Sequence, residues 1–307
     1  MEVPSEILEK LKELKAQKIF LQFPEGLKLK VQKIVKELEA EGFEVFVCLE
    51  KCFGACDVRE NEAKLLGCDC ILHIGHEEFI KTEFPVVYWE YFINSEVEPI
   101  LEKEFWKLEN FKKIGLITSV QFVNLIPKVE SFLRERGKEV FTSKALQYPG
   151  QVLGCDLRAA KSIEKEVDCF LAISAGEFYA AGLVFQTNKP VFNLDLEKRE
   201  IKSLEEFKKK TQKIIAWNKA QFKDAKKVGL LISWKKGQFK SPFELKKKLE
   251  AKGKEVFLLA MDEISPEKLE GLDLDFLINL ACPRIGIDDL PRYKIPVLNY
   301  QEIEGEI

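Results

Sequence analysis

One sequence pattern occurs three times in this chain, and this repetition limits the possible folds more than any other feature. Each copy has a lysine-led apolar run, a glycine followed by Glu-Val-Phe, an aspartate-led apolar run and an apolar run after a proline. The lysine-led runs begin at Lys18, Lys113 and Lys227. Ile19 and Ile114 are 95 residues apart, and so are Glu44 and Glu139. Shared order and spacing indicate an internal triplication.

Each copy is predicted to form a small α/β domain. Its apolar runs are continuous, which is typical of strands buried on both faces of a parallel sheet. The first copy carries apolar residues at helical spacing between its first two strands, at Leu29, Ile34, Val35 and Leu38. Alternating strands and helices imply right-handed crossovers. We expect strand, helix, strand, helix, strand and strand in each of three domains, at residues 1–108, 109–218 and 219–307.

Composition is that of a soluble globular protein. The chain has 307 residues and a net charge of −3, so no global basic field indicates a nucleic-acid partner. Residues 1–15 are predicted to form a charged amphipathic helix without the apolar core of a signal peptide. No window approaches the roughly 18–20 apolar residues of a membrane span. We expect a cytoplasmic protein, in which eight cysteines are thiols or metal ligands rather than disulfides.

Cysteines stand in three loops that follow predicted strands. Residues 52–58 read CFGACDV, residues 148–156 read YPGQVLGCD and residues 279–289 read NLACPRIGIDD. Cys56 and Cys155 follow the second strand of their copies, whereas Cys282 follows the third. Ligands bind parallel sheets at the carboxyl ends of strands, so three domains that face one axis would bring these loops together. Thiolates suit an iron–sulfur cluster, zinc or copper.

The residues themselves leave the ligand set open. Cys52 and Cys56 form a C-x3-C pair, which fits two thiols beside a turn as well as it fits a ligand pair. Arg59 stands where the usual radical S-adenosylmethionine (SAM) motif, C-x3-C-x2-C, would have its third cysteine. The cysteines that lie in or beside apolar runs are interpreted as buried thiols: Cys48, Cys68, Cys70 and Cys169.

Other candidate residues lie at the predicted strand ends. His76 lies in HIGHEEF, residues 73–79, at a predicted strand end, where it could orient a substrate or cap a loop, whereas His73 is interpreted as a core residue. Glu177 occupies the matching loop of the second copy, and Arg284 could offer a bidentate donor to a carboxylate or phosphate. FPEGL, residues 23–27, opens a helix and is a weaker anion-site candidate.

Taken together, FPEGL, FGACD, HIGHEEF, GQVLGCD and NLACPRIGIDD resemble the radical-generating subunit of archaeal diphthamide synthase, across all three predicted domains. The resemblance implies a 4Fe-4S cluster held by one cysteine from each domain, which by motif are Cys56, Cys155 and Cys282. It implies that SAM binds the open iron and is cleaved to methylthioadenosine and a 3-amino-3-carboxypropyl radical. That radical attacks a histidine of translation elongation factor 2. Such proteins are a noncanonical radical SAM type, which explains the missing motif.

Further expectations follow from the resemblance and from loop position. Gly75, His76, Glu177 and Arg284 are predicted to line the SAM pocket, and no catalytic side chain is predicted. A homodimer and an electron donor are expected. Cys52 is an extra thiol, and the FGAC motif favours Cys56 as the ligand.

Two alternatives remain open at this point. One is a quinolinate-synthase-like 4Fe-4S dehydratase, which also has three related domains and three cysteine ligands. The other is a triplicated binding scaffold whose thiols are core residues.

Overall fold

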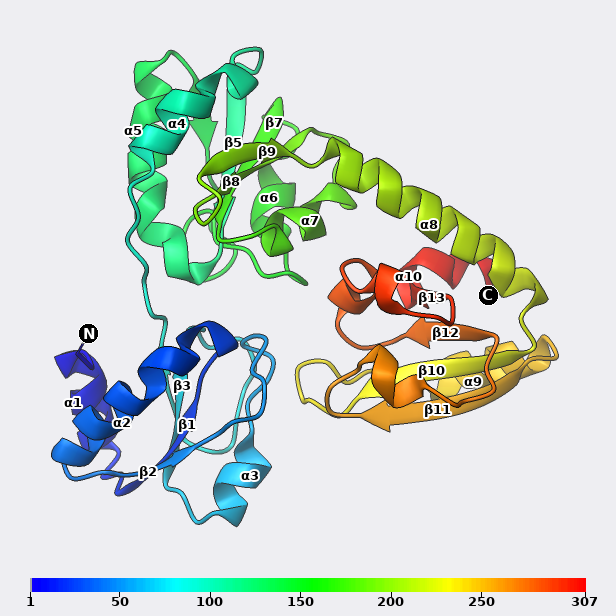
Figure 1. The fold of residues 1–307 in the computed structure, drawn as a ribbon, viewed down its shortest axis with the longest axis horizontal. Helices are drawn as coiled ribbons and strands as arrows, with labels where there is room; N and C mark the ends of the chain where they lie inside the picture. The colour runs from blue at the N-terminus through cyan, green and yellow to red at the C-terminus, as the bar shows by residue number, and fades with distance from the viewer. Residues whose placement is uncertain (1) are drawn as a thin grey trace. The chain divides into compact units, whose positions relative to one another are not determined.

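The structure is a computed structural model that describes residues 2–307, and it contains one sheet for each copy of the repeated pattern (Figure 1). The first sheet comprises β1 (Lys18–Gln22), β2 (Glu44–Val47), β3 (Cys70–Ile74) and β4 (Val86–Trp89). The second comprises β5 (Lys113–Thr118), β6 (Glu139–Phe141), β7 (Cys169–Ser174), β8 (Val191–Asp195) and β9 (Glu200–Ser203). The third comprises β10 (Lys227–Ser233), β11 (Glu255–Met261), β12 (Phe276–Asn279) and β13 (Val297–Asn299). The predicted class, three related α/β repeats, is confirmed.

All three sheets have the same topology. The strand orders are β2-β1-β3-β4, β6-β5-β7-β8-β9 and β11-β10-β12-β13. Every pairing is parallel except that of β9, which runs antiparallel to β8. In each sheet, the lysine that begins the first strand lies opposite the glutamate that begins the second strand. These register pairs are Lys18 with Glu44, Lys113 with Glu139 and Lys227 with Glu255.

Helices cover the sheets on both faces. The α-helices are α1 (Ser5–Glu13), α2 (Val31–Ala40), α3 (Glu60–Leu65), α4 (Glu98–Glu104), α5 (Ile126–Glu135), α6 (Arg158–Ile163), α7 (Phe178–Val184), α8 (Glu205–Asp224), α9 (Phe243–Ala251) and α10 (Tyr300–Ile303). Each sheet has an apolar cluster on either side, so its strands are buried as the continuous apolar runs predict. Gly42, Gly137 and Gly253 follow α2, α5 and α9 with positive φ, as C-cap glycines do.

Two details differ from the expected pattern. The helix expected between β11 and β12 is a short 3-10 helix, Pro266–Leu269, because the chain turns at Gly271, which has positive φ. Leu29 was expected on the buried face of a helix, but its side chain is fully exposed. It lies in the 3-10 helix Glu25–Lys30, whose three residues per turn rotate it away from the face that α2 buries.

The chain divides into two compact units. One contains the residues up to Phe92 together with Lys235–Gly237, and the other contains residues 93–234 and 238–307. Val97, Ile100, Leu101 and Leu108 pack into the core of the second sheet. Helix α8 runs through residue 218, and its Phe222 packs into the core of the third sheet. The domain boundaries at 108/109 and 218/219 stay predictions.

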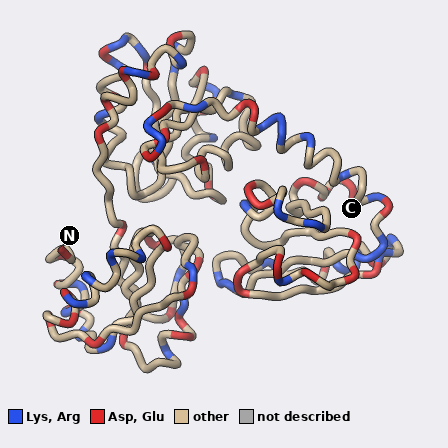
Figure 2. Tube along the Cα trace, in the orientation of Figure 1, with Lys and Arg blue, Asp and Glu red and all other residues tan. Residues whose placement is uncertain are grey.

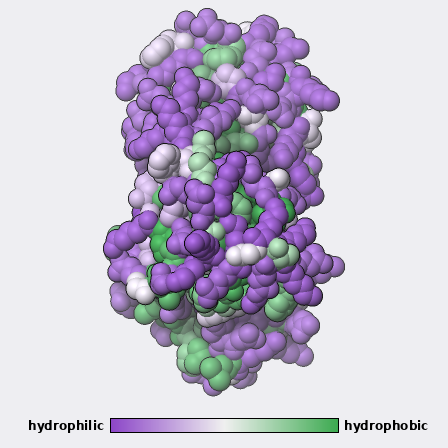
Figure 3. Space-filling model, turned by 90° about the vertical axis from the view of Figure 1, so that its right-hand side faces the viewer, coloured by the Kyte–Doolittle hydropathy of each residue, from purple (hydrophilic) through white to green (hydrophobic). Residues whose placement is uncertain are grey.

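Charged residues of both signs alternate along each repeat, as Figure 2 shows. Within residues 2–307, no helix combines the length and the apolarity that crossing a bilayer requires. The surface in Figure 3 is mostly hydrophilic with scattered hydrophobic patches. Segments of the third repeat expose large apolar side chains at Trp234, Phe239, Phe243, Phe257 and Leu258.

The repeated aspartates explain one landmark of the sequence pattern. Asp168 Oδ2 accepts hydrogen bonds from the backbone N–H groups of Lys112, at 3.0 Å, and Lys113, at 2.8 Å. Asp69 and Asp275 accept the equivalent pairs before β1 and β10, at 2.7–2.8 Å. These backbone hydrogen bonds lower the pKa of all three carboxyl groups. Each aspartate therefore ties the start of its own strand to the first strand of its sheet.

Replacement of one of these aspartates should give a pH-dependent loss of stability. We expect Asp168→Asn to lower the Tm at pH 7, because a neutral amide accepts backbone hydrogen bonds less strongly than a carboxylate. The folded-state pKa of Asp168 lies below its ordinary value of 3.8, so this contribution is present above that value and disappears as the pH falls through the lowered pKa.

Thermal unfolding from pH 7 down to about pH 3 checks this expectation, since the Tm difference between the two proteins should shrink toward acid. Glu102→Gln, at an exposed site in α4, is the matched control and should show no such difference. A Tm deficit of Asp168→Asn that is independent of pH would contradict the carboxylate's role.

Candidate functional site

Burial separates the eight cysteines into two groups. Five thiols are buried: Cys48, Cys52, Cys68, Cys70 and Cys169. The other three are Cys56 and Cys282, which are partly exposed, and Cys155, which is exposed. These three are the cysteines that the sequence motifs predict as ligands.

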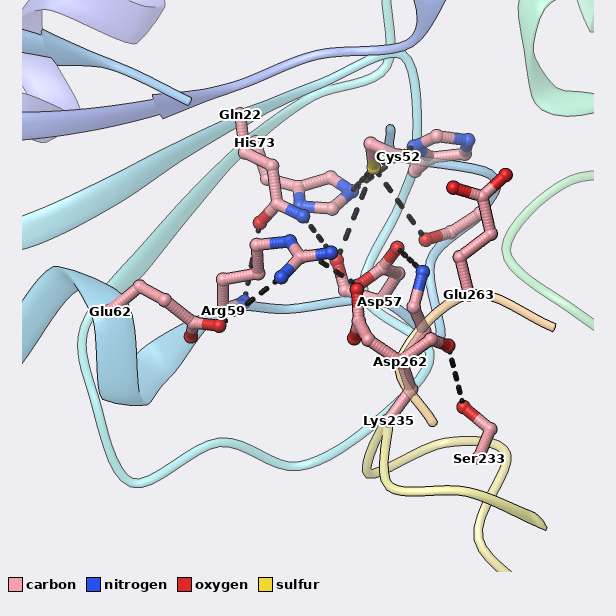
Figure 4. Close-up of polar contacts among 12 residues, drawn as sticks. Gln22, Cys52, Asp57, Arg59, Glu62, His73, Ser233, Lys235, Asp262 and Glu263 are labelled. Atoms are coloured by element: carbon pink, nitrogen blue, oxygen red, sulfur yellow. Dashed lines mark hydrogen bonds and ion pairs between the residues drawn. The ribbon is translucent and has the colours of Figure 1, made fainter. Parts of the chain in front are cut away.

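The loop that carries Cys56 is held at the carboxyl ends of β1 and β2. Gln22, the last residue of β1, donates from Nε2 to the carbonyl oxygen of Asp57 at 2.6 Å. Its Oε1 accepts from the backbone N–H of Arg59 at 3.3 Å. Both Gln22 and Asp57 are buried (Figure 4). One side-chain amide therefore fixes the backbone immediately after Cys56.

Residues 235–237, which belong to the first compact unit, contact the loop that carries Cys56. The Lys235 ammonium forms an ion pair with the Asp57 carboxylate at 2.5 Å (Figure 4). Both side chains are at least 96% buried. The backbone N–H of Gly237 donates to the carbonyl oxygen of Cys56 at 3.2 Å. A Cβ at Gly237 would lie 2.5 Å from Cβ and 2.7 Å from Cα of Cys56, so only glycine fits there.

A second thiol lies deeper in the first repeat, among two histidines. Cys52 Sγ is 3.8 Å from His73 Nε2 and 3.9 Å from His76 Nδ1, and the two nitrogens are 3.0 Å apart. Burial lowers the pKa of His76 to about 4 and that of His73 well below its ordinary value, so both rings are neutral. Burial, with the nearby Asp57 charge, raises the pKa of the Cys52 thiol.

Cys155 and Cys282 lie near one buried guanidinium in the second unit. Arg284 stands two residues after Cys282, is 96% buried and stacks on the Phe178 ring at 4.2 Å from its centroid. A Cβ at Gly154, the residue before Cys155, would lie 3.3 Å from Arg284 Cδ. A Cβ at Gly182 would lie 3.4 Å from Arg284 Nη1. The two glycines therefore keep space beside the guanidinium.

Only some of the hydrogen-bond donors of the Arg284 guanidinium have partners within residues 2–307. Arg284 forms an ion pair with Asp288 through Nη2, while Nε and Nη1 have no hydrogen-bond partner among residues 2–307. Burial lowers the pKa of Arg284 and raises that of Asp288 to about 6, since desolvation outweighs their attraction. A buried guanidinium with two open N–H groups is suited to binding an anion from outside the chain.

The other predicted pocket residues have partners of their own. Glu177 directly precedes α7 and forms ion pairs with Lys202 at 2.6 Å and Lys198 at 3.6 Å. Gly75 has φ +85°, and a Cβ there would lie 2.9 Å from Pro24 Cγ. His76 lies directly beside Gly75 and faces His73. The structure brings together the residues around Cys56 in the first unit and, separately, those around Arg284 in the second unit. That these residues line a SAM pocket stays a prediction.

Sequence reasoning missed three residues of this region. Asp57 directly follows Cys56 and could have been found from that position. His73 was interpreted as a core residue, and it is buried, but its ring also contacts Cys52 and His76. Lys235 is 178 residues from Asp57, and no local pattern marks it.

Comparison with known proteins identifies a family. The family model for diphthamide synthesis proteins matches residues 23–305. The chain is 34% identical to the 2-(3-amino-3-carboxypropyl)histidine synthase of Pyrococcus horikoshii, over 99% of this chain and 90% of that protein. It is 31% identical to the enzyme of the same name from Methanocaldococcus jannaschii, over 94% and 83% of the two chains.

A solved structure has the same fold. The crystal structure of Dph2 from Pyrococcus horikoshii with a 4Fe-4S cluster matches with a TM-score of 0.88 at 32% identity. The match covers 99% of this chain and 90% of that one. The likeness therefore extends over all three repeats.

Gly237 offers a local test of how the Cys56 loop is held. We expect Gly237→Ala to lower the free energy of unfolding by about 1–3 kcal/mol, because the added methyl group overlaps the backbone of Cys56. Displacement of the loop should also speed alkylation of the Cys56 thiol. Denaturant unfolding and mass-spectrometric mapping of iodoacetamide labelling measure the two effects.

The matched control is Gly305→Ala, where a Cβ would meet nothing within 4 Å. It should leave both the stability and the Cys56 labelling rate near those of the unmodified chain. Unchanged Cys56 labelling in Gly237→Ala would contradict the contact.

Proposed function

This chain belongs to the diphthamide synthesis protein family, and we propose that it transfers the 3-amino-3-carboxypropyl group of SAM to a histidine of translation elongation factor 2. The transfer is the first step of diphthamide biosynthesis and follows a radical mechanism. The bond from the sulfonium sulfur to the 3-amino-3-carboxypropyl carbon breaks, and methylthioadenosine leaves. A carbon–carbon bond to the imidazole forms, and the imidazole adduct then loses a proton and gives back to the enzyme the one electron that was taken up when the carbon–sulfur bond broke, so the transfer is redox-neutral overall.

The observation that carries the proposal is that the family motifs fall on the three thiols the fold leaves accessible. We propose Cys56, Cys155 and Cys282 as the ligands of a 4Fe-4S cluster. The donor set fits, because soft thiolates are the ligands of such clusters and these three are neither deeply buried nor in disulfides. A bound cluster with three protein ligands supplies an electron and one iron open to SAM.

We propose that Arg284 binds the carboxylate of SAM. Its Nε and Nη1 groups have no acceptor among residues 2–307, so the buried guanidinium keeps N–H donors and a positive charge that a carboxylate can satisfy. Asp288 pairs with Nη2, and Phe178 covers one face of the guanidinium, so the group is held in one orientation. Gly75, His76 and Glu177 stay predictions for the SAM pocket.

Partners follow from the reaction. Elongation factor 2 supplies the target histidine, and a separate electron donor must reduce the enzyme before SAM is cleaved. A homodimer and a cytoplasmic location remain part of the proposal. The family match does not favour the alternative of a quinolinate-synthase-like dehydratase.

Cysteine substitution tests both the ligands and the activity. We expect Cys56→Ala, Cys155→Ala and Cys282→Ala each to lose the bound iron and sulfide after anaerobic reconstitution, because each removes one of three thiolate ligands. Cys52→Ala should keep the iron and sulfide, and serves as the matched control four residues from Cys56. Iron and sulfide analysis with visible absorption gives this readout without an activity assay.

Product analysis completes the test. The reduced, reconstituted chain with SAM and elongation factor 2 should yield methylthioadenosine and one modified histidine peptide. Iron-loaded protein that forms no methylthioadenosine would overturn the proposed function. Iron loss in Cys52→Ala with retention in Cys56→Ala would overturn the ligand set alone.

The role of Arg284 should appear as weakened SAM binding. We expect Arg284→Lys to raise the KM for SAM about tenfold or more, because a lysine ammonium does not reproduce the planar guanidinium that stacks on Phe178 and keeps Nε and Nη1 as donors. Methylthioadenosine formation at varied SAM concentration measures the change, with iron content measured in parallel. Arg292→Lys changes an exposed arginine of the same unit and should leave the KM unaltered. An unchanged KM in Arg284→Lys would exclude the carboxylate contact.

A further inference from the structure

A cluster of three potential metal ligands is buried in the first repeat and includes none of the accessible cysteines. Cys52, His73 and His76 place one sulfur and two imidazole nitrogens within 4.8 Å of one another. In a tetrahedral zinc site, bonds of about 2.3 Å to sulfur and 2.0–2.1 Å to nitrogen put the ligand atoms roughly 3.3–3.6 Å apart. The measured separations of 3.0, 3.8 and 3.9 Å lie within a few tenths of an ångström of that arrangement.

We propose that Cys52, His73 and His76 bind a single divalent transition-metal ion, with zinc as the expected occupant, separately from the iron–sulfur cluster. One thiolate and two imidazoles form a borderline-soft donor set, which favours zinc over calcium or magnesium. Three protein ligands leave one of four positions around zinc open to a water or a carbonyl oxygen.

The equal distances from the sulfur to both nitrogens favour a shared cation. A hydrogen bond between the imidazoles joins only His73 and His76, and it does not require the sulfur to lie equally far from both nitrogens. An ion bound by all three residues requires just such an arrangement. With the ion on His73 Nε2, the ring proton lies on Nδ1, which has no partner among residues 2–307. That cost is small beside the free energy of binding a structural zinc ion.

The fold presents the three ligands before any ion binds. His73 lies in β3 and His76 follows it by three residues, while Cys52 stands in the loop after β2. All three side chains are more than 90% buried, so their positions are fixed by packing. The bound ion would tie the loop that contains Cys56 to the end of β3.

Metal analysis of the reconstituted holoprotein tests this proposal. After addition of zinc sulfate and removal of the excess, we expect about one zinc per chain beside the cluster iron. Zinc K-edge X-ray absorption should show one sulfur and two nitrogen ligands. Cys52→Ser and His73→Gln should each weaken zinc binding about a hundredfold or more while keeping the iron. Cys68→Ser, which alters another buried thiol of the first sheet, should keep the zinc.

A second measurement separates this site from the cluster. Cys56→Ala lacks a proposed cluster ligand, yet it should still bind one Co²⁺ with an absorption band from thiolate-to-cobalt charge transfer. If zinc follows Cys56 rather than Cys52, or if no zinc binds, the proposal is wrong and the three residues form only a buried hydrogen-bonded group. Circular dichroism of each variant verifies that the chain is folded. Neither result depends on SAM cleavage.

Discussion

Parallel hydrogen bonding around a central strand is the constraint on which the rest of this structure depends. In the first repeat, β1 lies between β2 and β3, so the chain leaves all three strands at one edge of the sheet. Gln22 ends β1, Cys52 and Asp57 follow β2, and His73 lies near the end of β3. Gln22 donates to Asp57 and accepts from Arg59, and both hydrogen bonds exist because these strand ends are adjacent. An antiparallel partner would send one of these loops to the opposite edge.

The three repeats are alike at one edge of their sheets and differ at the other. At the amino ends, an aspartate accepts the same two backbone hydrogen bonds in every copy. At the carboxyl ends, the third residue after the repeated proline is Tyr88, Asn193 or Asn299. Asn193 donates to the carbonyl oxygen of Gly176, and Asn299 donates to that of Pro283. The first edge is the same in all three repeats, while at the second edge the asparagines of the last two repeats each hold a different loop.

Whether a feature could be predicted depends on how far apart in the sequence the interacting residues lie. The strands, their pairing and the C-cap glycines depend on apolar runs and single residues at fixed spacing, so the sequence pattern indicates them. Leu29 was misplaced because apolar spacing alone does not distinguish a 3-10 turn from the first turn of a helix. The pair of Lys235 and Asp57 joins residues 178 positions apart and has no local signature. Likewise, the contact of Cys52 with two histidines depends on loop conformation, which residue spacing does not specify.

Each of the three accessible thiols has an ion pair close to it in the sequence. Asp57 directly follows Cys56 and pairs with Lys235. Asp156 directly follows Cys155 and pairs with Arg158. Arg284 stands two residues after Cys282 and pairs with Asp288. Desolvation makes a buried ion pair a poor source of stability compared with apolar packing.

Two of these pairs involve a side chain that is at least 96% buried, so global stability does not account for them. Each pair restrains the backbone within two residues of a thiol, and it does so without placing a bulky apolar group against that thiol. Loops that must hold a soft ligand atom at a fixed position while leaving it accessible require this kind of restraint. The ion pairs therefore support the assignment of Cys56, Cys155 and Cys282 as one functional set, independently of the sequence motifs that first suggested it.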